Sequence, residues 1–252
     1  MVKTETEVST MSKPQNSTVK VKRFSKAFVW AHAINAISFI ALYITALPMY
    51  TEFFNWLYPV LGGPEGARLL HRIFAVAFIT PTFIWVIFDF KGFKLWMKEL
   101  VTWKKRDLEF FTEFVKELFG FNFKHVKQTF FNAGEKINSI IQIFTAILII
   151  GSGFPMWFPQ IFPRAVVQWG YLLHNVGFGL AIAVVVGHIY LSVIHKNSKP
   201  GYTGVITGEV PAWWAKEHYT EWYEEEVKKG NFPKLDDPHK PTSPDKKKKK
   251  GA

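Results

Sequence analysis

Two histidines, His174 and His188, lie inside a run of thirty residues, Ala165–Ile194, that contains no Asp, Glu, Lys or Arg. A helix of that length is about 45 Å long, whereas the hydrocarbon core of a bilayer is about 30 Å thick, so the run can cross a membrane. The two histidines are 14 residues apart, which corresponds to a rise of about 21 Å and nearly four full turns. Both rings therefore leave one face of the helix, near opposite membrane surfaces.

The chemistry that imidazole brings to such a position is metal ligation, including ligation of haem iron. An ionisable ring inside a membrane is costly and therefore suggests a function. The alternative is structural, because a single histidine in a span more often makes a hydrogen-bonded contact with a neighbouring helix. The number and depth of the other histidines help to decide between metal ligation and a structural contact.

Three further apolar segments are long enough to cross a membrane. The predicted spans are Ala27–Tyr50, about Gly66–Phe88, Ile137–Phe158 and Ala165–Ile194. Pro48 is expected to close the first span and Pro81 to kink the second. Residues 89–131 combine mixed charge with the apolar period of a helix, which predicts amphipathic helix at the membrane surface. The sequence therefore predicts an all-α integral membrane four-helix bundle with cytoplasmic amphipathic segments.

The composition agrees with a membrane protein, because 48% of the 252 residues are hydrophobic and 25 are Phe. The chain has no cysteine, so it cannot attach a c-type haem through Cys-x-x-Cys-His, ligate an iron–sulfur cluster through Cys or form a disulfide. Any haem is therefore held by noncovalent ligation. The net charge of +11 comes from basic residues that flank the apolar runs, a pattern typical of membrane topology and not of nucleic-acid binding.

The basic residues also predict the orientation of the spans. One side carries four Lys or Arg before the first span, ten between the second and third, and Lys196 and Lys199 after the fourth. The other side carries only Arg68, Arg72 and Arg164. Because basic loops stay in the cytoplasm, both termini are predicted to be cytoplasmic.

The chain divides into three predicted parts. Residues 1–22 are polar and lack the apolar core of a signal peptide, so they are predicted to be a disordered cytoplasmic N-terminus. Residues 23–226 form the four-span domain, and the stretch 201–229 is predicted to include a short helix on the cytoplasmic surface. Residues 227–252 are a basic, low-complexity tail that faces solvent or anionic lipid.

Four histidines within or at the ends of the spans fall at two depths. Counted from the cytoplasmic charges, His32 is 6 residues from Lys26 and His188 is 8 from Lys196, whereas His71 is 20 from Lys91 and His174 is 22 from Lys196. Within each pair the offset is about 3 Å. His32 therefore pairs with His188 and His71 with His174, each pair from two helices, as a bis-imidazole iron site requires. We predict two b-type haems, against the alternative of packing histidines.

Other residues give weaker signals. Gly177, Gly179 and Gly187 leave room for a flat macrocycle, although glycine is also common in membrane helices for packing alone. The four remaining histidines lie at a helix end or in polar segments and are not predicted to be ligands; they are His125, His195, His218 and His239.

The chain resembles a known family, the gamma subunit of membrane-bound formate dehydrogenases, which is a cytochrome b. The resemblance rests on L-H-R at the start of the second span, N-A-G-x-K before the third, G-H-I-Y in the fourth, and then G-x-I-T-G-E-V, W-A-K-x-H and W-Y. It covers roughly Arg23–Glu226. The resemblance implies that His71 and His174 hold an outer haem and that His32 and His188 hold an inner haem, in agreement with the depth count.

The resemblance also implies a quinone site beside the inner haem. The corresponding residues are Asn132, Gly134, Glu135, Lys136 and His188. Glu135 departs from the family, which more often has Gln there, so the resemblance does not define the local proton chemistry or the type of quinone. A structural alternative exists too, because Asn is favoured as a helix N-cap and the third span starts nearby.

The predicted function is that of the quinone-reducing, electron-transfer subunit of a membrane-bound oxidoreductase in the prokaryotic cytoplasmic (inner) membrane. The chain supplies no catalytic residue of its own for substrate oxidation. Electrons would come from an iron–sulfur subunit and a catalytic dehydrogenase subunit on the outer side and pass through two haems to quinone, with protons from the cytoplasm. Membrane lipid is an expected partner and nucleic acid is not.

Two alternatives remain open at this stage. Related cytochromes b serve hydrogenases and thiosulfate reductases. A haem-free membrane transporter or scaffold would also bury histidines, but it is expected to carry carboxylates in mid-span, and the charge-free runs have none.

Tags fused to either terminus are expected to be cytoplasmic, because the basic residues are concentrated on that side. Protease treatment of intact cells tests this expectation. Both tags should resist digestion until the membrane is broken, and cleavage of either tag in intact cells would contradict the predicted topology.

Overall fold

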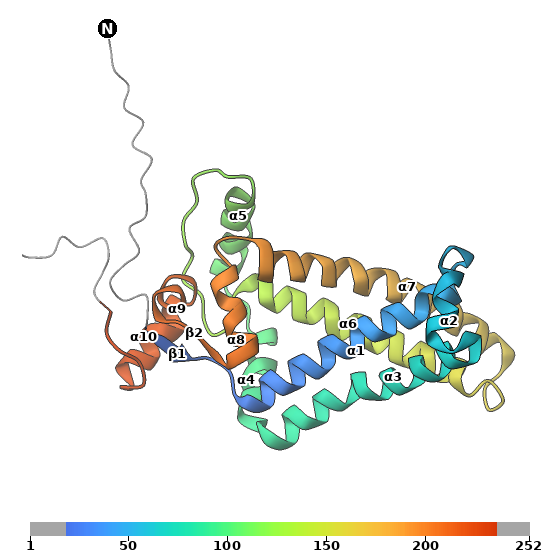
Figure 1. The fold of residues 1–252 in the computed structure, drawn as a ribbon. Coiled ribbons are helices and arrows are strands. Elements are labelled where there is room, and N and C mark those ends of the chain that lie inside the picture. The colour runs from blue at the N-terminus through green and yellow to red at the C-terminus, as the bar shows by residue number, and fades with distance from the viewer. Residues whose placement is uncertain (1–18, 236–252) are drawn as a thin grey trace, which may run out of the picture.

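The computed structural model describes residues 19–235, and four long helices run side by side through most of it (Figure 1). They are α1 (Lys26–Tyr50), α3 (Gly63–Phe88), α6 (Ala133–Trp157) and α7 (Arg164–Ile189), which continues into a π-helical turn, η2 (Tyr190–Ile194). All four are long and apolar enough to cross a membrane. The predicted all-α bundle with four spans is confirmed.

The helix ends follow local capping. The Ser25 hydroxyl accepts the backbone N–H of Phe28 at 3.1 Å and begins α1. Asn132 caps α6, which therefore begins at Ala133, four residues before the predicted start. Pro48 lies inside α1 and does not close it; the helix continues to Tyr50, because loss of one backbone N–H is tolerated in a membrane helix.

The surface of the bundle is apolar, as contact with lipid requires. Large side chains that are more than half exposed stand out from each long helix, for example Trp30, Phe83, Phe144 and Leu172. Small residues fill the buried positions, among them Ser38, Ala67, Gly177 and Ala181. Small residues allow close approach of helix backbones. Accordingly, α1 packs along α3 and α6 packs along α7, which gives two helical hairpins.

The two ends of the bundle differ. At one end, η1 (Glu52–Leu57) and α2 (Tyr58–Leu61) connect α1 to α3. At the other end lie α4 (Phe90–Val101) and α5 (Lys105–Leu118), which occupy the segment predicted to be amphipathic helix (Figure 1). Residues 119–132 then return to α6 without helix.

A compact unit that the sequence did not predict covers this second end. Strand β1 (Lys20–Lys22) pairs antiparallel with β2 (Glu209–Pro211), so that Val21 lies opposite Val210. Around the strands lie η3 (Lys199–Gly201), α8 (Tyr202–Thr207), α9 (Ala212–His218) and α10 (Thr220–Lys228). The buried core of this unit consists of Val21, Val210, Ala212, Trp214, Ala215, Tyr219, Trp222 and Tyr223.

This unit corrects two predictions about the ends of the chain. Lys20–Lys22 form a strand, so the predicted disorder of 1–22 is wrong there; residues 1–18 lie outside the described part. The stretch 201–229 forms three short helices and a strand instead of one helix, because its aromatic residues bury one another. Of the predicted tail, Val227, Phe232 and Leu235 pack against the core, and residues 236–252 lie outside the described part.

Gly208 connects this unit to the residues just before α1 through backbone hydrogen bonds. Its carbonyl accepts the backbone N–H groups of Arg23 at 2.8 Å and Phe24 at 3.0 Å. Its φ is +84°, and a Cβ at this position would lie 2.7 Å from the Phe24 carbonyl oxygen. Only glycine fits both requirements.

Gly208→Ala is therefore expected to destabilise the protein by more than the ~1–2 kcal/mol cost of a left-handed conformation, because the added methyl also collides with backbone. Gly120→Ala is the matched control, since Gly120 has φ +75° but its Cβ would meet nothing within 4 Å. Thermal unfolding of both variants in detergent tests this difference. Equal shifts in Tm would show that the collision with Phe24 does not contribute to the loss of stability.

Candidate functional site

The four histidines of the spans form two pairs, each of which crosses between the helical hairpins. His32 of α1 faces His188 of α7, with ring centres 6.4 Å apart. His71 of α3 faces His174 of α7, also with ring centres 6.4 Å apart. These are the pairs that the depth count predicts, and α7 contributes one member to each.

The spacing within each pair fits a single metal ion between the rings. Metal–imidazole bonds are about 2.0–2.1 Å long and the bonding nitrogen lies about 1.1 Å from the ring centre, so two imidazoles on opposite sides of one ion have ring centres about 6.3 Å apart. The donor set is also suitable, because two neutral imidazoles are an established axial ligand type for haem iron. The residues therefore fit haem at both levels.

Hydrogen bonds fix the orientation of the His71–His174 pair. His71 Nδ1 lies 2.9 Å from the Thr45 hydroxyl of α1. His174 Nδ1 lies 3.1 Å from the Ser152 hydroxyl and 3.0 Å from the Ile149 carbonyl oxygen, both on α6. Contacts at Nδ1 leave Nε2 as the nitrogen for a metal and set the plane of the ring. Thr45 and Ser152 were not predicted as partners of these rings; the only signal in the sequence was a hydroxyl residue within each apolar span.

Glycines around these rings have different roles. A Cβ at Gly153 would lie 3.2 Å from His174 Cε1, so the absence of a side chain there admits the ring. A Cβ at Gly177 would lie 2.8 Å from Ile149 Cγ1, which identifies Gly177 as a packing contact between α6 and α7. Gly179 and Gly187 have nothing within 4 Å of a Cβ position. Gly177 thus supports the structural alternative that was open for the predicted glycines.

The other described histidines lie outside the spans and have other partners. His125 Nε2 is 2.8 Å from Glu217, and hydrogen bonding to this carboxylate raises the pKa of His125. The His218 ring lies 5.1 Å from the His125 ring, and burial lowers the pKa of His218 to about 4. His195 contacts Ser198. His239 lies outside the described residues.

The start of α6, where a quinone site is predicted, is a capped helix end. The Asn132 side-chain oxygen accepts the Glu135 backbone N–H at 2.8 Å, and Glu135 accepts the Asn132 backbone N–H at 2.9 Å. This capping box is the structural role that the sequence left open for Asn132. The Asn132 amide also donates to the Tyr219 hydroxyl at 3.3 Å.

The predicted neighbours Gly134 and Lys136 are packed against α4 and α5. A Cβ at Gly134 would lie 3.3 Å from the Phe110 ring. Lys136 is buried; its ammonium donates to the Thr102 carbonyl at 3.1 Å and lies within 3.6 Å of Glu99 and Asp107. The His188 Nδ1 is 3.5 Å from the amide nitrogen of Asn138, one turn further along α6.

Glu135 forms an ion pair with a buried arginine that was not predicted from the sequence. Arg23, whose side chain is 2% exposed, contacts both Glu135 oxygens at 3.1 Å and stacks over the Tyr219 ring at 3.9 Å. Burial alone would lower the pKa of Arg23, but Glu135 and Tyr219 outweigh it and raise that pKa. Burial raises the pKa of Tyr219, so its hydroxyl stays protonated and donates to Glu135 at 2.8 Å.

The amino-acid sequence is similar to a known protein family and to several named proteins over most of its length. The family model described as prokaryotic cytochrome b561 matches residues 23–207. The nitrate-inducible formate dehydrogenase cytochrome b556(Fdn) subunit of Escherichia coli strain K12 is 27% identical over 213 residues, which cover 82% of this chain and 90% of the relative.

Two further relatives carry similar names. The formate dehydrogenase cytochrome b556(fdo) subunit of the same strain is 28% identical, over 77% of this chain and 87% of the relative. The formate dehydrogenase cytochrome b556 subunit of Haemophilus influenzae is 24% identical, over 78% of this chain and 79% of the relative.

Proposed function

Because the chain belongs to the prokaryotic cytochrome b561 family, we propose that it is the membrane-anchoring dihaem cytochrome b subunit of a formate dehydrogenase-type complex. In this role it passes electrons from an iron–sulfur partner through two b haems to quinone. The names of its relatives support the choice of formate dehydrogenase over hydrogenase or thiosulfate reductase.

The proposal rests on one observation: four histidines form two pairs, and the ring centres within each pair are 6.4 Å apart. His71 and His174 would hold the outer haem, and His32 and His188 the inner haem. When bound, haem iron supplies one-electron redox chemistry. The chain supplies the ligands, keeps them at two levels and excludes water with the apolar bundle.

The orientation of the complex follows from charge. The end of the bundle with α4, α5 and the β1–β2 unit carries most of the basic residues, so this end faces the cytoplasm together with both termini. The end with Arg68, Arg72 and Arg164 faces outward, toward the iron–sulfur and dehydrogenase subunits. Substrate electrons then enter near His71 and His174, and quinone is reduced on the cytoplasmic side.

The quinone site lies in this proposal beside His188, near the start of α6. Asn132, Gly134, Glu135 and Lys136 are its residues. Glu135, whose side chain is one-third exposed, connects the buried Arg23 to solvent and is a route for protons from the cytoplasm.

Removal of a single ligand tests the haem pairs. His71→Ala and His174→Ala are each expected to abolish the same haem, and His32→Ala and His188→Ala the other, because each iron loses one of its two axial imidazoles. Redox titration of the haem absorbance in membranes separates the two components. Loss of the same component in His32→Ala and His71→Ala would refute the pairing.

Two substitutions of Asn132 separate its capping role from a role in quinone binding. Asn132→Ser keeps an N-cap oxygen but removes the amide donor, so it should retain both haems and slow their reoxidation by quinone several-fold. Asn132→Ala also removes the cap and should cost about 1 kcal/mol of stability. Stopped-flow absorbance and thermal unfolding measure the two effects. Wild-type reoxidation in Asn132→Ser would remove Asn132 from the quinone site.

A further inference from the structure

The two histidine pairs differ in what their Nδ1 atoms contact. In the His71–His174 pair, three oxygen atoms lie between 2.9 and 3.1 Å from an Nδ1: the Thr45 hydroxyl for His71, and the Ser152 hydroxyl and the Ile149 carbonyl for His174. Thr45 and Ser152 are both buried. Each belongs to the helix that packs along the helix of its histidine, α1 along α3 and α6 along α7. Each hairpin therefore supplies one histidine and one buried hydroxyl at this level.

The two hydroxyl groups act as acceptors toward the rings, because their own hydrogens are already used. Thr45 donates to the Ala41 carbonyl at 2.9 Å, and Ser152 donates to the Leu148 carbonyl at 2.6 Å. In both cases the acceptor is four residues earlier on the same helix, a common arrangement for Ser and Thr. A hydroxyl carries a single hydrogen, so each oxygen accepts the Nδ1–H of its histidine. The proton is thereby fixed on Nδ1.

The His32–His188 pair has no close acceptors of this kind. His188 Nδ1 has one contact, 3.5 Å from the amide nitrogen of Asn138, which is longer than an ordinary hydrogen bond. The His32 ring lies beside two other rings, Phe28 at 6.0 Å and His188 at 6.4 Å, and no hydrogen bond within residues 19–235 reaches its nitrogens. The two levels therefore differ in the number and length of their Nδ1 hydrogen bonds.

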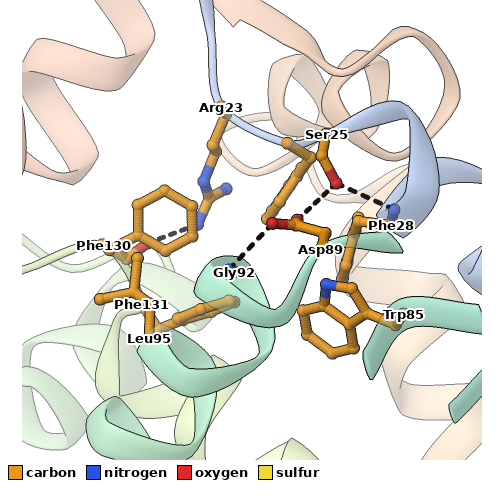
Figure 2. Close-up of a pocket in the computed structure, with 10 residues that line it drawn as sticks. Arg23, Ser25, Phe28, Trp85, Asp89, Gly92, Leu95, Phe130 and Phe131 are labelled. Atoms are coloured by element: carbon orange, nitrogen blue, oxygen red, sulfur yellow. Dashed lines mark hydrogen bonds between the residues drawn. The ribbon is translucent and has the colours of Figure 1, made fainter. Parts of the chain in front are cut away.

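The hydroxyl at the start of α1 does not serve the His32–His188 pair either. Figure 2 shows that the Ser25 hydroxyl accepts the Phe28 backbone N–H, at 3.1 Å, and donates to the Asp89 carboxylate, at 2.6 Å. These two bonds cap α1 and connect it to the end of α3. This end of the helix therefore uses its hydroxyl for capping, whereas Thr45 near the other end uses its hydroxyl for a histidine.

The difference between the pairs has a consequence for redox chemistry. A hydrogen bond donated by Nδ1–H makes an imidazole that ligates a metal through Nε2 more basic. A more basic ligand favours ferric over ferrous iron, because ferric iron carries one more positive charge, and hydrogen bonding to the ligands is one of the means by which a protein sets the potential of haem. Three close acceptors at one level, against one long contact at the other, favour a lower potential at the first level.

We propose that Thr45 and Ser152 are positioning residues that lower the reduction potential of the haem held by His71 and His174 below that of the other haem. This inference rests on the proposed function and adds to it two residues and the order of the two potentials. Transfer of an electron from the outer level to the inner level is then energetically downhill. The order of potentials thus favours reduction on the cytoplasmic side.

Thr45→Val in the full-length, haem-loaded protein tests the proposal, because it keeps the shape of the side chain and removes the acceptor without changing any charge. In the haem component that His71→Ala abolishes, the ratio of reduced to oxidised haem at a fixed potential should rise about threefold to tenfold, the effect of one hydrogen bond. Ser152→Ala should raise the same ratio by less, because the Ile149 carbonyl still accepts from His174. Redox titration of the haem absorbance measures both ratios.

Two further variants separate the hydrogen bond from a packing effect. Thr45→Ser loses a methyl group but keeps the hydroxyl, so it should titrate like the wild type. Thr145→Val is the matched control on α6, since Thr145 is buried and its hydroxyl donates to the Gln142 carbonyl at 3.0 Å; it should leave both potentials unchanged. An equal shift in Thr145→Val and Thr45→Val would overturn the proposal, as would a wild-type protein in which the His71–His174 component has the higher potential.

Electron paramagnetic resonance of the oxidised variants provides the check on ligation. Both irons should remain low-spin with two imidazole ligands, so that a shift in potential reports the hydrogen bond and not a lost ligand. If Thr45→Val fails to retain haem, Ser152→Ala alone decides, and an unchanged potential in it overturns the proposal. Two haems with wild-type potentials in both variants would overturn this inference while the proposed function stands. A wild-type protein that binds no haem would instead contradict the proposed function itself.

Discussion

The arrangement depends on imidazole pairs that cross between two helical hairpins. Within each hairpin, small residues allow the helices to pack closely, but a pair such as His71 and His174 must stay at one distance across the space between hairpins. At that distance a metal ion fits and direct ring stacking does not. The rest of the structure can be understood as the means of holding this separation.

The compact unit around β1 and β2 contributes to that separation by linking both hairpins. The Arg23–Glu135 ion pair connects the residues before α1 with the start of α6. Gly208 binds the backbone of Arg23 and Phe24 from the C-terminal side, and Lys136 fixes α6 to the loop between α4 and α5. The side chains of Arg23 and Lys136 are buried, and a buried charge that loses its partner is strongly destabilising. The charged network therefore has a structural role besides any part in proton transfer.

The sequence predicted the features that depend on periodicity and composition. Four apolar runs and the amphipathic stretch after α3 follow from spacing along a helix, and the structure has helices at each of these places. Counting residues along the helices also predicted which histidine rings lie close together. It did not predict the β1–β2 pair, because Val21 and Val210 are 189 residues apart in the chain and neither strand has a repeating pattern. Nor did it predict Thr45 and Ser152 as partners of His71 and His174, because that contact depends on how helices rotate against one another.

The most direct test of the account is the haem content and ligation of the purified full-length protein. Pyridine haemochrome analysis should give two b-type haems per chain, and electron paramagnetic resonance should show both irons as low-spin with two imidazole ligands. One haem per chain, a high-spin iron or a colourless protein would contradict the claim that each cross-hairpin histidine pair holds a haem.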